Sequence, residues 1–231
     1  MMNLPIHYAE VETIYSQTIG AGYRSIAVTS AVAGEGKTSL AEALVKRAHI
    51  VDKKVLLVEM NTFNPVISER LRQLQLYTHQ DNQVFAIEQQ GFSFLPAPQK
   101  LKNVLKYRES NLLRTSITQW LNEFDCIVFD TAPLTALNQS NISSEVICEV
   151  CDGTVLIVEA GKTPANMIQE SIEKLKTKKA NLIGSVINDK SNPSLLTEML
   201  RESARLNCFF PKLMQFIRTK LSQMVLLKVS V

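Results

Sequence analysis

The stretch SAVAGEGKTS, residues 30–39, most restricts what this chain can fold into. A β-rich run, SIAVT at Ser25–Thr29, leads into it, and the apolar residues after it repeat at helical spacing. Those residues are Leu40, Ala41, Leu44, Val45 and Ala48. A strand, a glycine-containing loop and a helix in this order predict the beginning of an α/β fold.

Short apolar runs recur along the rest of the chain, with helical segments between them. The runs predicted as strands are Val55–Val58, Phe92–Leu95, Cys126–Phe129, Thr154–Val158 and Leu182–Ile187. Between the last two, Thr163 offers a capping hydroxyl before Pro164 at the first position of a helix. Near-continuous apolar strands separated by helices are typical of a parallel sheet covered on both faces. The sequence therefore predicts an α/β fold with a doubly wound, mostly parallel sheet and helices on both faces.

The composition is that of an ordinary folded protein. The 231 residues are 45% hydrophobic and 20% charged, and the net charge of +3 is too small to indicate a nucleic-acid partner. No apolar run approaches the roughly 20 residues of a membrane-spanning helix, and the N-terminal residues lack a signal-peptide pattern. We therefore expect a cytoplasmic protein without a nucleic-acid partner, and contact with the cytoplasmic face of the inner membrane is left open.

Cys148 and Cys151 have the C-x-x-C spacing of redox pairs and of metal half-sites. A zinc site also needs further ligands, and His7, His49 and His79 are far from this pair in sequence. We therefore interpret both cysteines as reduced structural thiols, with a redox or metal role as the alternative.

The loop of residues 30–39 lies where α/β sheets bind ligands, beyond the carboxyl end of a strand. Its glycines let the backbone bend closely, so consecutive N–H groups and the following helix N-terminus favour a polyphosphate. Lys37 would contact the β- and γ-phosphates, and the Thr38 hydroxyl would coordinate Mg²⁺. The residues predicted to surround the phosphates are Ala33, Gly34, Glu35, Gly36, Lys37, Thr38 and Ser39.

A carboxylate stands at the end of a second apolar strand. In the run FDCIVFDT, residues 124–131, Asp130 occupies the carboxyl tip, where a Walker B aspartate binds Mg²⁺ directly or through water. An aspartate in this place often only closes a strand as a turn residue. Its combination with the loop and the strand order makes the metal-binding interpretation the stronger one.

Together these segments resemble the bacterial tyrosine kinases, the capsule and exopolysaccharide kinases within the MinD/ParA group of P-loop ATPases. AVAGEGKTSLAEAL is similar to the deviant Walker A loop of that family, S-x-P-G-E-G-K-[ST], which also lacks the outer glycine that Ala31 replaces here. VLLVEMNTFNP at Val55–Pro65 is similar to its Walker A′ segment, and FDCIVFDTAPL at Phe124–Leu134 to its Walker B segment. CDGTVLIVEAGKT and LIGSVIND match the later strands, so the resemblance covers residues 10 to 190. Partitioning members carry a signature lysine where this chain has Val32, which favours the kinase branch.

The resemblance implies that the chain binds ATP or ADP with Mg²⁺. It implies that Lys37 acts on the phosphates, that Thr38 and Asp130 hold the metal, and that Asn188 contacts the adenine. The first Walker A′ aspartate, which the family associates with Mg²⁺ and the catalytic base, is Glu59 here, one methylene longer. Lys37, Glu59 and Asp130 are thus the candidate catalytic residues, and Thr38, Asp130 and Glu59 the candidate metal ligands. The family also implies a membrane-protein partner of the chain-length-regulator (polysaccharide co-polymerase) type.

Several residues of the family pattern are replaced. The second Walker A′ aspartate is Asn61, and the paired arginines that follow are Phe63 and Asn64. Asn138 and Gln139 stand where family members commonly keep another aspartate. An amide neither holds Mg²⁺ as a carboxylate does nor accepts the proton of a tyrosine hydroxyl, so these changes put phosphorylation of tyrosine in doubt.

Two further departures concern assembly and substrate. The family's N-terminal E-x-x-R-x-x-R helix links subunits in a ring, but here Glu12 is followed by Tyr15 and Thr18 in place of the arginines. The family's tyrosine-rich C-terminal tail is also missing, since residues 191–231 contain no tyrosine. The sequence therefore leaves a homo-oligomer open.

The last residues differ from the family. We expect a nucleotide-binding domain at residues 1–206 and a basic amphipathic segment at residues 207–231. The segment is basic and has no acidic residue, and it could lie on an anionic membrane, dock a partner or pack on its own core. Its apolar stripe at helical spacing consists of Phe209, Phe210, Leu213, Phe216, Ile217, Leu221, Met224 and Leu227.

Three functions are compatible with these residues. The first is a Mg-ATP-dependent ATPase or kinase-like regulator of exopolysaccharide or capsule biosynthesis and export. The second is a non-catalytic scaffold that binds nucleotide and changes conformation. The third is a MinD/ParA-type positioning ATPase, against which Val32 argues because the signature lysine is absent.

Overall fold

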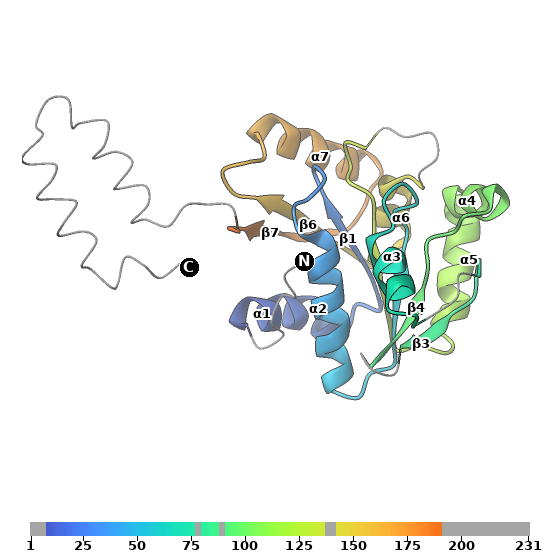
Figure 1. Cartoon of the computed structure of the whole chain (residues 1–231). Helices are drawn as coiled ribbons and strands as arrows, with labels where there is room; N and C mark the ends of the chain where they lie inside the picture. The colour runs from blue at the N-terminus through green and yellow to red at the C-terminus, as the bar shows by residue number, and fades with distance from the viewer. Residues whose placement is uncertain (1–7, 77–79, 88–90, 137–141, 191–231) are drawn as a thin grey trace, which may run out of the picture. The chain divides into compact units, whose positions relative to one another are not determined.

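The computed structural model describes residues 8–76, 80–87, 91–136 and 142–190 (Figure 1). The chain divides into two compact units, residues 1–158 with 163–188 and residues 159–162 with 189–231. The first unit carries the site described below. The helices are α1 (Ala9–Gln17), α2 (Lys37–Ile50), α3 (Val66–Gln73), α4 (Leu101–Arg108), α5 (Ser110–Trp120), α6 (Ser144–Val150) and α7 (Ala165–Thr177), with a 3-10 turn at Ile19–Ala21. The strands are β1 (Ser25–Ser30), β2 (Val55–Glu59), β3 (Phe85–Ile87), β4 (Phe92–Leu95), β5 (Cys126–Asp130), β6 (Gly153–Glu159) and β7 (Leu182–Asn188).

These strands form one sheet in the order β3-β4-β2-β5-β1-β6-β7. β1 pairs in parallel with β5 and β6, and β2 pairs in parallel with β4 and β5. Only β3 is shown antiparallel to its neighbour among the described pairings. The predicted doubly wound, mostly parallel sheet is confirmed, and β3 is a strand that the sequence pattern did not reveal.

Helices cover both faces of this sheet. One buried cluster joins α1, α2 and α3 to the sheet, and the other joins α4, α5, α6 and α7 to it. Within β2, Val55 and Leu57 belong to the first cluster, whereas Leu56 and Val58 belong to the second. Because successive side chains of a strand point to opposite faces, a strand covered on both sides must be apolar throughout, which explains the run VLLV.

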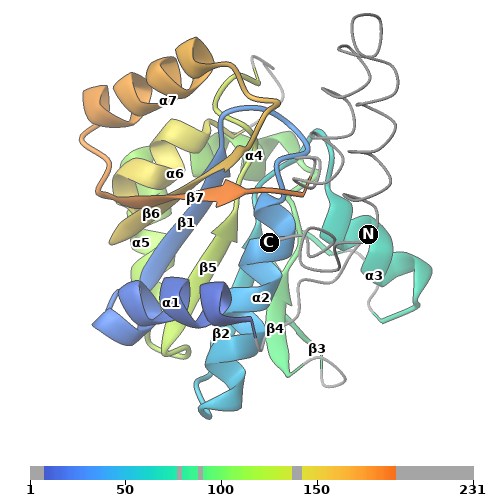
Figure 2. The same ribbon diagram turned by 90° about the vertical axis from the view of Figure 1, so that its left-hand side faces the viewer.

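The sheet ends at β7, which faces the viewer in Figure 2. This strand has no fully buried residue, and its Ile187 side chain is 73% exposed. The amphipathic segment predicted at residues 207–231 lies outside the described residues. Within the described part of the chain, no helix is long and apolar enough to cross a membrane.

The three described cysteines, Cys126, Cys148 and Cys151, are buried free thiols. Burial raises the pKa of Cys126 and of Cys148 to about 12, so neither is a reactive thiolate near neutral pH. The described residues contain no cluster of three or more potential metal ligands among histidine, cysteine and acidic side chains. The burial of these thiols fits the structural interpretation of the C-x-x-C pair.

Candidate functional site

The glycine-containing loop connects β1 to α2 at the carboxyl edge of the sheet. Gly34 and Gly36 have backbone φ angles of 89° and 97°, a left-handed conformation that glycine adopts without strain. Gly36 is the N-cap of α2, so the unsatisfied N–H groups of the helix begin directly beside the loop. Ala33 and Gly34 are exposed, whereas the Lys37 and Thr38 side chains are buried. The backbone is therefore shaped for an anion at the helix N-terminus.

Thr38 and Asp130 come together although they lie far apart in sequence. Thr38 Oγ1 donates a hydrogen bond of 2.8 Å to Asp130 Oδ2, while the buried Asp130 Oδ1 has no hydrogen-bond partner among the described residues. Burial raises the pKa of Asp130 to about 6, and the nearby Lys37 ammonium and the Thr38 hydrogen bond lower it. A buried carboxylate oxygen without a partner next to a hydroxyl fits the oxygen ligands that Mg²⁺ prefers.

Glu59 is the register partner of Asp130 on the neighbouring strand β2. Its carboxylate, however, is directed to α3. Oε1 accepts the N–H of Ile67 at 2.7 Å, and Oε2 accepts the N–H of Ser68 at 2.9 Å as well as the Ser68 hydroxyl. Glu59 thus supplies the N-terminal hydrogen bonds of α3, since the N-cap residue Pro65 has no side chain able to do so.

The surroundings of Glu59 disfavour its charged form. The side chain is fully buried, which raises its pKa to about 8. The hydrogen bond from Ser68 lowers this pKa, and the neighbouring Asp130 carboxylate raises it. A Glu59 that remains protonated near neutral pH cannot accept a further proton. Its assignment as catalytic base and metal ligand stays a prediction.

Glu35 and Asn188 hold the loop from two sides. The buried Glu35 carboxylate accepts the N–H of Val32 at 2.8 Å and the hydroxyl of Thr163. Asn188, at the end of β7, donates from Nδ2 to the backbone oxygen of Glu35 at 2.9 Å. A Cβ on Gly36 would lie 2.7 Å from the same Asn188 nitrogen, so this position is closed to larger residues. Asn188 therefore lies beside the loop, and its predicted contact with adenine stays a prediction.

Two more contacts of the loop were not anticipated from the sequence. The Thr135 hydroxyl donates to the backbone oxygen of Ala31 at 2.7 Å, and the N–H of Leu134 donates to that of Ser30 at 2.8 Å. Both donors lie beyond Asp130 in the chain, in the connection between β5 and α6. No sequence signal marks such a contact, because a threonine hydroxyl takes its partner from whichever segment packs against it.

Thr163 also differs from its predicted role. Helix α7 begins at Ala165, Pro164 is its N-cap, and no side chain caps it. The Thr163 hydroxyl donates to Glu35 instead. The prediction of a Thr163 cap was wrong because the helix begins one residue later than expected, which makes Pro164 the N-cap and leaves Thr163 outside the capping position.

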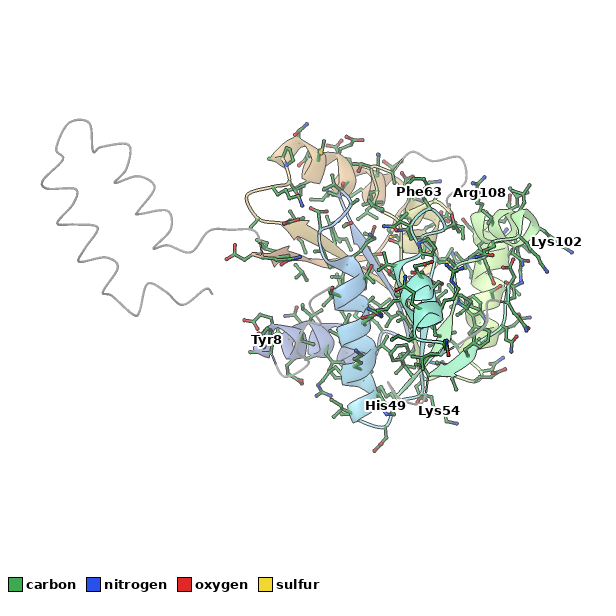
Figure 3. All side chains as sticks on the ribbon, in the orientation of Figure 1. Tyr8, His49, Lys54, Phe63, Lys102 and Arg108 are labelled. Carbon is green, nitrogen blue, oxygen red and sulfur yellow. The ribbon has the colours of Figure 1, made fainter. Side chains whose placement is uncertain are left out.

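The residues that depart from the family pattern have local roles. Asn61 Oδ1 accepts the N–H of Asn64 at 3.2 Å and so stabilises the turn between β2 and α3. The Phe63 side chain is 73% exposed (Figure 3). His49 lies at the other end of the molecule in that view, away from the carboxyl edge of the sheet. Asn138 and Gln139 lie outside the described residues.

The glutamate of the N-terminal helix α1, Glu12, forms an ion pair within the chain. Glu12 on α1 pairs with Arg47 on α2 through hydrogen bonds of 2.5 Å from Nε and 2.9 Å from Nη2. The Arg47 guanidinium also lies 4.5 Å from the centre of the Tyr15 ring. Arg47 lowers the pKa of Glu12 through the same hydrogen bonds. The pair attaches α1 to α2.

Comparison with curated proteins finds tyrosine-protein kinases. The chain is 25% identical over 176 residues to the tyrosine-protein kinase YwqD of Bacillus subtilis (strain 168), covering 72% of this chain and 73% of that protein. It is 24% identical over 191 residues to the tyrosine-protein kinase CpsD of Streptococcus agalactiae, covering 78% of this chain and 81% of that protein. No protein-family model matches the chain.

Comparison with solved structures finds kinase domains and a cell division protein complex with a similar fold. The kinase domain of the Escherichia coli tyrosine kinase ETK superposes with a TM-score of 0.64 at 16% identity, covering 84% of both chains. The kinase domain of VpsO gives 0.61 at 21% identity, covering 78% of this chain and 95% of that one. The MinC:MinD cell division complex of Aquifex aeolicus gives 0.59 at 16% identity, covering 78% of this chain and 72% of that one. At these identities the superpositions establish the fold.

Proposed function

The chain is a divergent relative of the bacterial tyrosine kinases with the P-loop fold that they share with MinD/ParA proteins, and from this relationship we propose that it binds Mg-ATP at residues 33–39. The observation that carries the proposal is the Thr38–Asp130 hydrogen bond beside Lys37, with Asp130 Oδ1 left without a partner. A metal ion is the ligand that would use this oxygen and offset the cost of its burial.

Each residue of the site has a part in holding the nucleotide. The amide groups from Ala33 to Ser39 and the Lys37 ammonium would hold the phosphates at the N-terminus of α2. Thr38 and Asp130 would hold Mg²⁺, which when bound neutralises phosphate charge. Asn188 would contact the adenine, and its present hydrogen bond to Glu35 already places it beside the loop.

The chemistry after binding depends on Glu59. We propose turnover of ATP, as an ATPase or kinase-like activity, with Glu59 as the candidate base. A second candidate function, a scaffold gated by nucleotide without turnover, is favoured by one specific observation. Both oxygens of Glu59 are occupied by the N-terminus of α3, and its pKa is raised to about 8. A base held in this way must leave α3 before it can act on a substrate.

The similarity to the bacterial tyrosine kinases also suggests a cellular role. We propose a regulator of exopolysaccharide or capsule biosynthesis and export in the cytoplasm, at the cytoplasmic face of the inner membrane. Its partner would be a membrane protein of the chain-length-regulator type, and residues 207–231 would form a segment separate from residues 1–206 that contacts the membrane. The names of the curated relatives as tyrosine-protein kinases support the kinase-like part of this proposal.

Calorimetry on the full chain tests binding. ATP and ADP are titrated with and without Mg²⁺ into the unsubstituted protein, into Lys37→Ala and into Lys178→Ala as an exposed control. We expect Mg-dependent binding by the unsubstituted protein and the control, and its loss in Lys37→Ala. Absence of binding by the unsubstituted protein would overturn the proposal.

Phosphate release then separates the two candidate functions. Turnover by the unsubstituted protein that falls in Lys37→Ala and Glu59→Gln supports the enzyme. Equal background rates in all three proteins, while the unsubstituted protein still binds nucleotide, support the scaffold.

A further inference from the structure

Glu35 is an unusual residue to find inside an anion-binding loop. A carboxylate at this place opposes the binding of phosphate if its charge faces the ligand. The structure instead buries the side chain completely, although the adjacent Gly34 is exposed. The carboxylate therefore lies on the inner side of the loop.

Its two oxygens join the loop to itself and to a distant segment. Oε2 accepts the N–H of Val32, three residues earlier, at 2.8 Å. Oε1 accepts the hydroxyl of Thr163, which lies 128 residues later, just before α7. The first contact shapes the bend of the loop, and the second connects that bend to the segment that leads into α7.

The backbone of Glu35 makes a third connection. Its carbonyl oxygen accepts Asn188 Nδ2 at 2.9 Å, from the carboxyl end of β7. The next residue, Gly36, begins the cap of α2. One residue thus joins the loop to two segments that follow different strands of the sheet.

From these contacts we infer that Glu35 is a positioning residue of the nucleotide site: with Thr163 it holds the Val32 amide and the loop in the conformation that receives the phosphates. The inference rests on the proposed function for its ligand. It adds that the loop is coupled to the start of α7, so that phosphates bound to the loop and the position of Thr163 influence each other.

The roles of shape and charge can be separated by substitution. Glu35→Ala removes both acceptors, and Thr163→Val removes the hydroxyl that donates to Glu35 Oε1. Each change is expected to weaken the binding of Mg-ATP by roughly tenfold or more, because a hydrogen bond to a buried carboxyl group is lost. Glu35→Gln keeps an acceptor for Val32, and Thr163→Ser keeps the hydroxyl, so both should retain most of the affinity. Thr177→Val, which removes an exposed hydroxyl from α7, is the matched control.

A double-mutant cycle on the full chain tests the coupling. If Glu35 and Thr163 act together, Glu35→Ala combined with Thr163→Val is no weaker in binding than Glu35→Ala alone. Losses that multiply would contradict the inference, as would wild-type affinity in Glu35→Ala. Glu35→Gln as weak as Glu35→Ala would also contradict it, because charge rather than position would then be responsible.

Hydrogen exchange of the nucleotide-free protein gives an outcome that does not depend on the ligand. We expect Thr163→Val and Glu35→Ala to speed the exchange of the amides in residues 31–36 by roughly tenfold, with Thr177→Val unchanged. Unchanged exchange in the loop would overturn the inference even if nucleotide binds. Faster exchange in a protein that binds no nucleotide would retain the positioning role and reject the proposed function.

Discussion

Glu59 and Asp130 are register partners at the ends of β2 and β5, yet their carboxylates are used in different ways. Asp130 accepts the Thr38 hydroxyl with one oxygen and leaves the other without a partner, whereas Glu59 uses both oxygens on α3. The N–H of Met60 donates to the backbone oxygen of Asp130 at 2.8 Å, so the two strand ends are also joined directly. Two acids that the sequence pairs for one metal therefore have different partners, the Thr38 hydroxyl for Asp130 and the N-terminus of α3 for Glu59.

Asp130→Asn should change nucleotide affinity and stability in opposite directions. The amide still accepts the Thr38 hydroxyl, but it replaces a charged metal ligand, so we expect the Mg-dependent gain in ATP affinity to fall by at least about tenfold. In metal-free buffer at pH 8 the same change removes a buried charge that Lys37 and Thr38 compensate only in part, and it should raise the free energy of unfolding by about 1–3 kcal/mol. Titration calorimetry and denaturant unfolding measure the two effects.

Asp125→Asn is the control for this experiment, because Asp125 is exposed next to the other end of the same strand. It should leave magnesium dependence unchanged. Full magnesium dependence in Asp130→Asn would remove Asp130 from the metal site.

The pKa of Glu59 predicts a dependence of stability on pH. The pKa in the folded protein is about 8, above the ordinary glutamate value of 4.5, so the folded state binds more protons between these values. The free energy of unfolding should therefore fall as the pH rises from about 4.5 to 8. Asp130, with a pKa of about 6, contributes in the lower part of this range, so the interval from pH 6 to 8 reports mainly on Glu59.

Glu59→Gln should flatten the profile between pH 6 and 8 and reduce the slope between about pH 4.5 and 6 to the part that Asp130 contributes. Urea unfolding at half-unit steps of pH measures it. An identical slope in both proteins above pH 6 would mean that Glu59 is ionised throughout.

The hydrogen bond from the Ser68 hydroxyl to Glu59 is expected to stabilise the N-terminal turn of α3. Ser68→Ala removes a hydroxyl donor to a buried acid and should destabilise the start of the helix by about 1–2 kcal/mol. It should also raise the pKa of Glu59 further, because that hydrogen bond lowers it. Ser116→Ala is a matched control, since Ser116 is a buried helical serine whose hydroxyl donates to the backbone oxygen of Leu112. Hydrogen exchange in residues 66–73 should rise in the first variant and stay constant in the second.

Alanine substitutions at three glycines distinguish the cost of backbone strain from the cost of steric overlap. Gly36→Ala places a side chain at φ 97° and 2.7 Å from Asn188 Nδ2. Gly22→Ala has a similar φ of 98° with no atom within 4 Å, and Gly184→Ala has neither problem. We expect Gly22→Ala to cost about 1–2 kcal/mol, Gly36→Ala more, and Gly184→Ala almost nothing. Thermal unfolding ranks them, and equal costs at Gly36 and Gly22 would mean that Asn188 moves freely.

The strands, the loop and the order of the elements could be predicted from the sequence because they depend on local rules. Apolar runs such as Val55–Val58 must be covered on both faces, and the glycines of the loop allow a bend that other residues resist. Both rules operate over a few neighbouring residues. The short strand β3 was missed because three residues carry too little periodicity.

The partners of the polar side chains were decided only by the tertiary structure. Glu59 accepts the N–H groups of Ile67 and Ser68, eight and nine residues later, because α3 packs against the end of β2. Thr163 contacts Glu35 across 128 residues, and no local sequence pattern specifies that partner. A buried polar atom takes the nearest available donor or acceptor, because leaving it unpaired costs more free energy than a local preference provides. The residue types in the sequence determined that polar side chains would form hydrogen bonds at the carboxyl edge of the sheet. The packing of α3 and of the segment before α7 determined which groups became their partners.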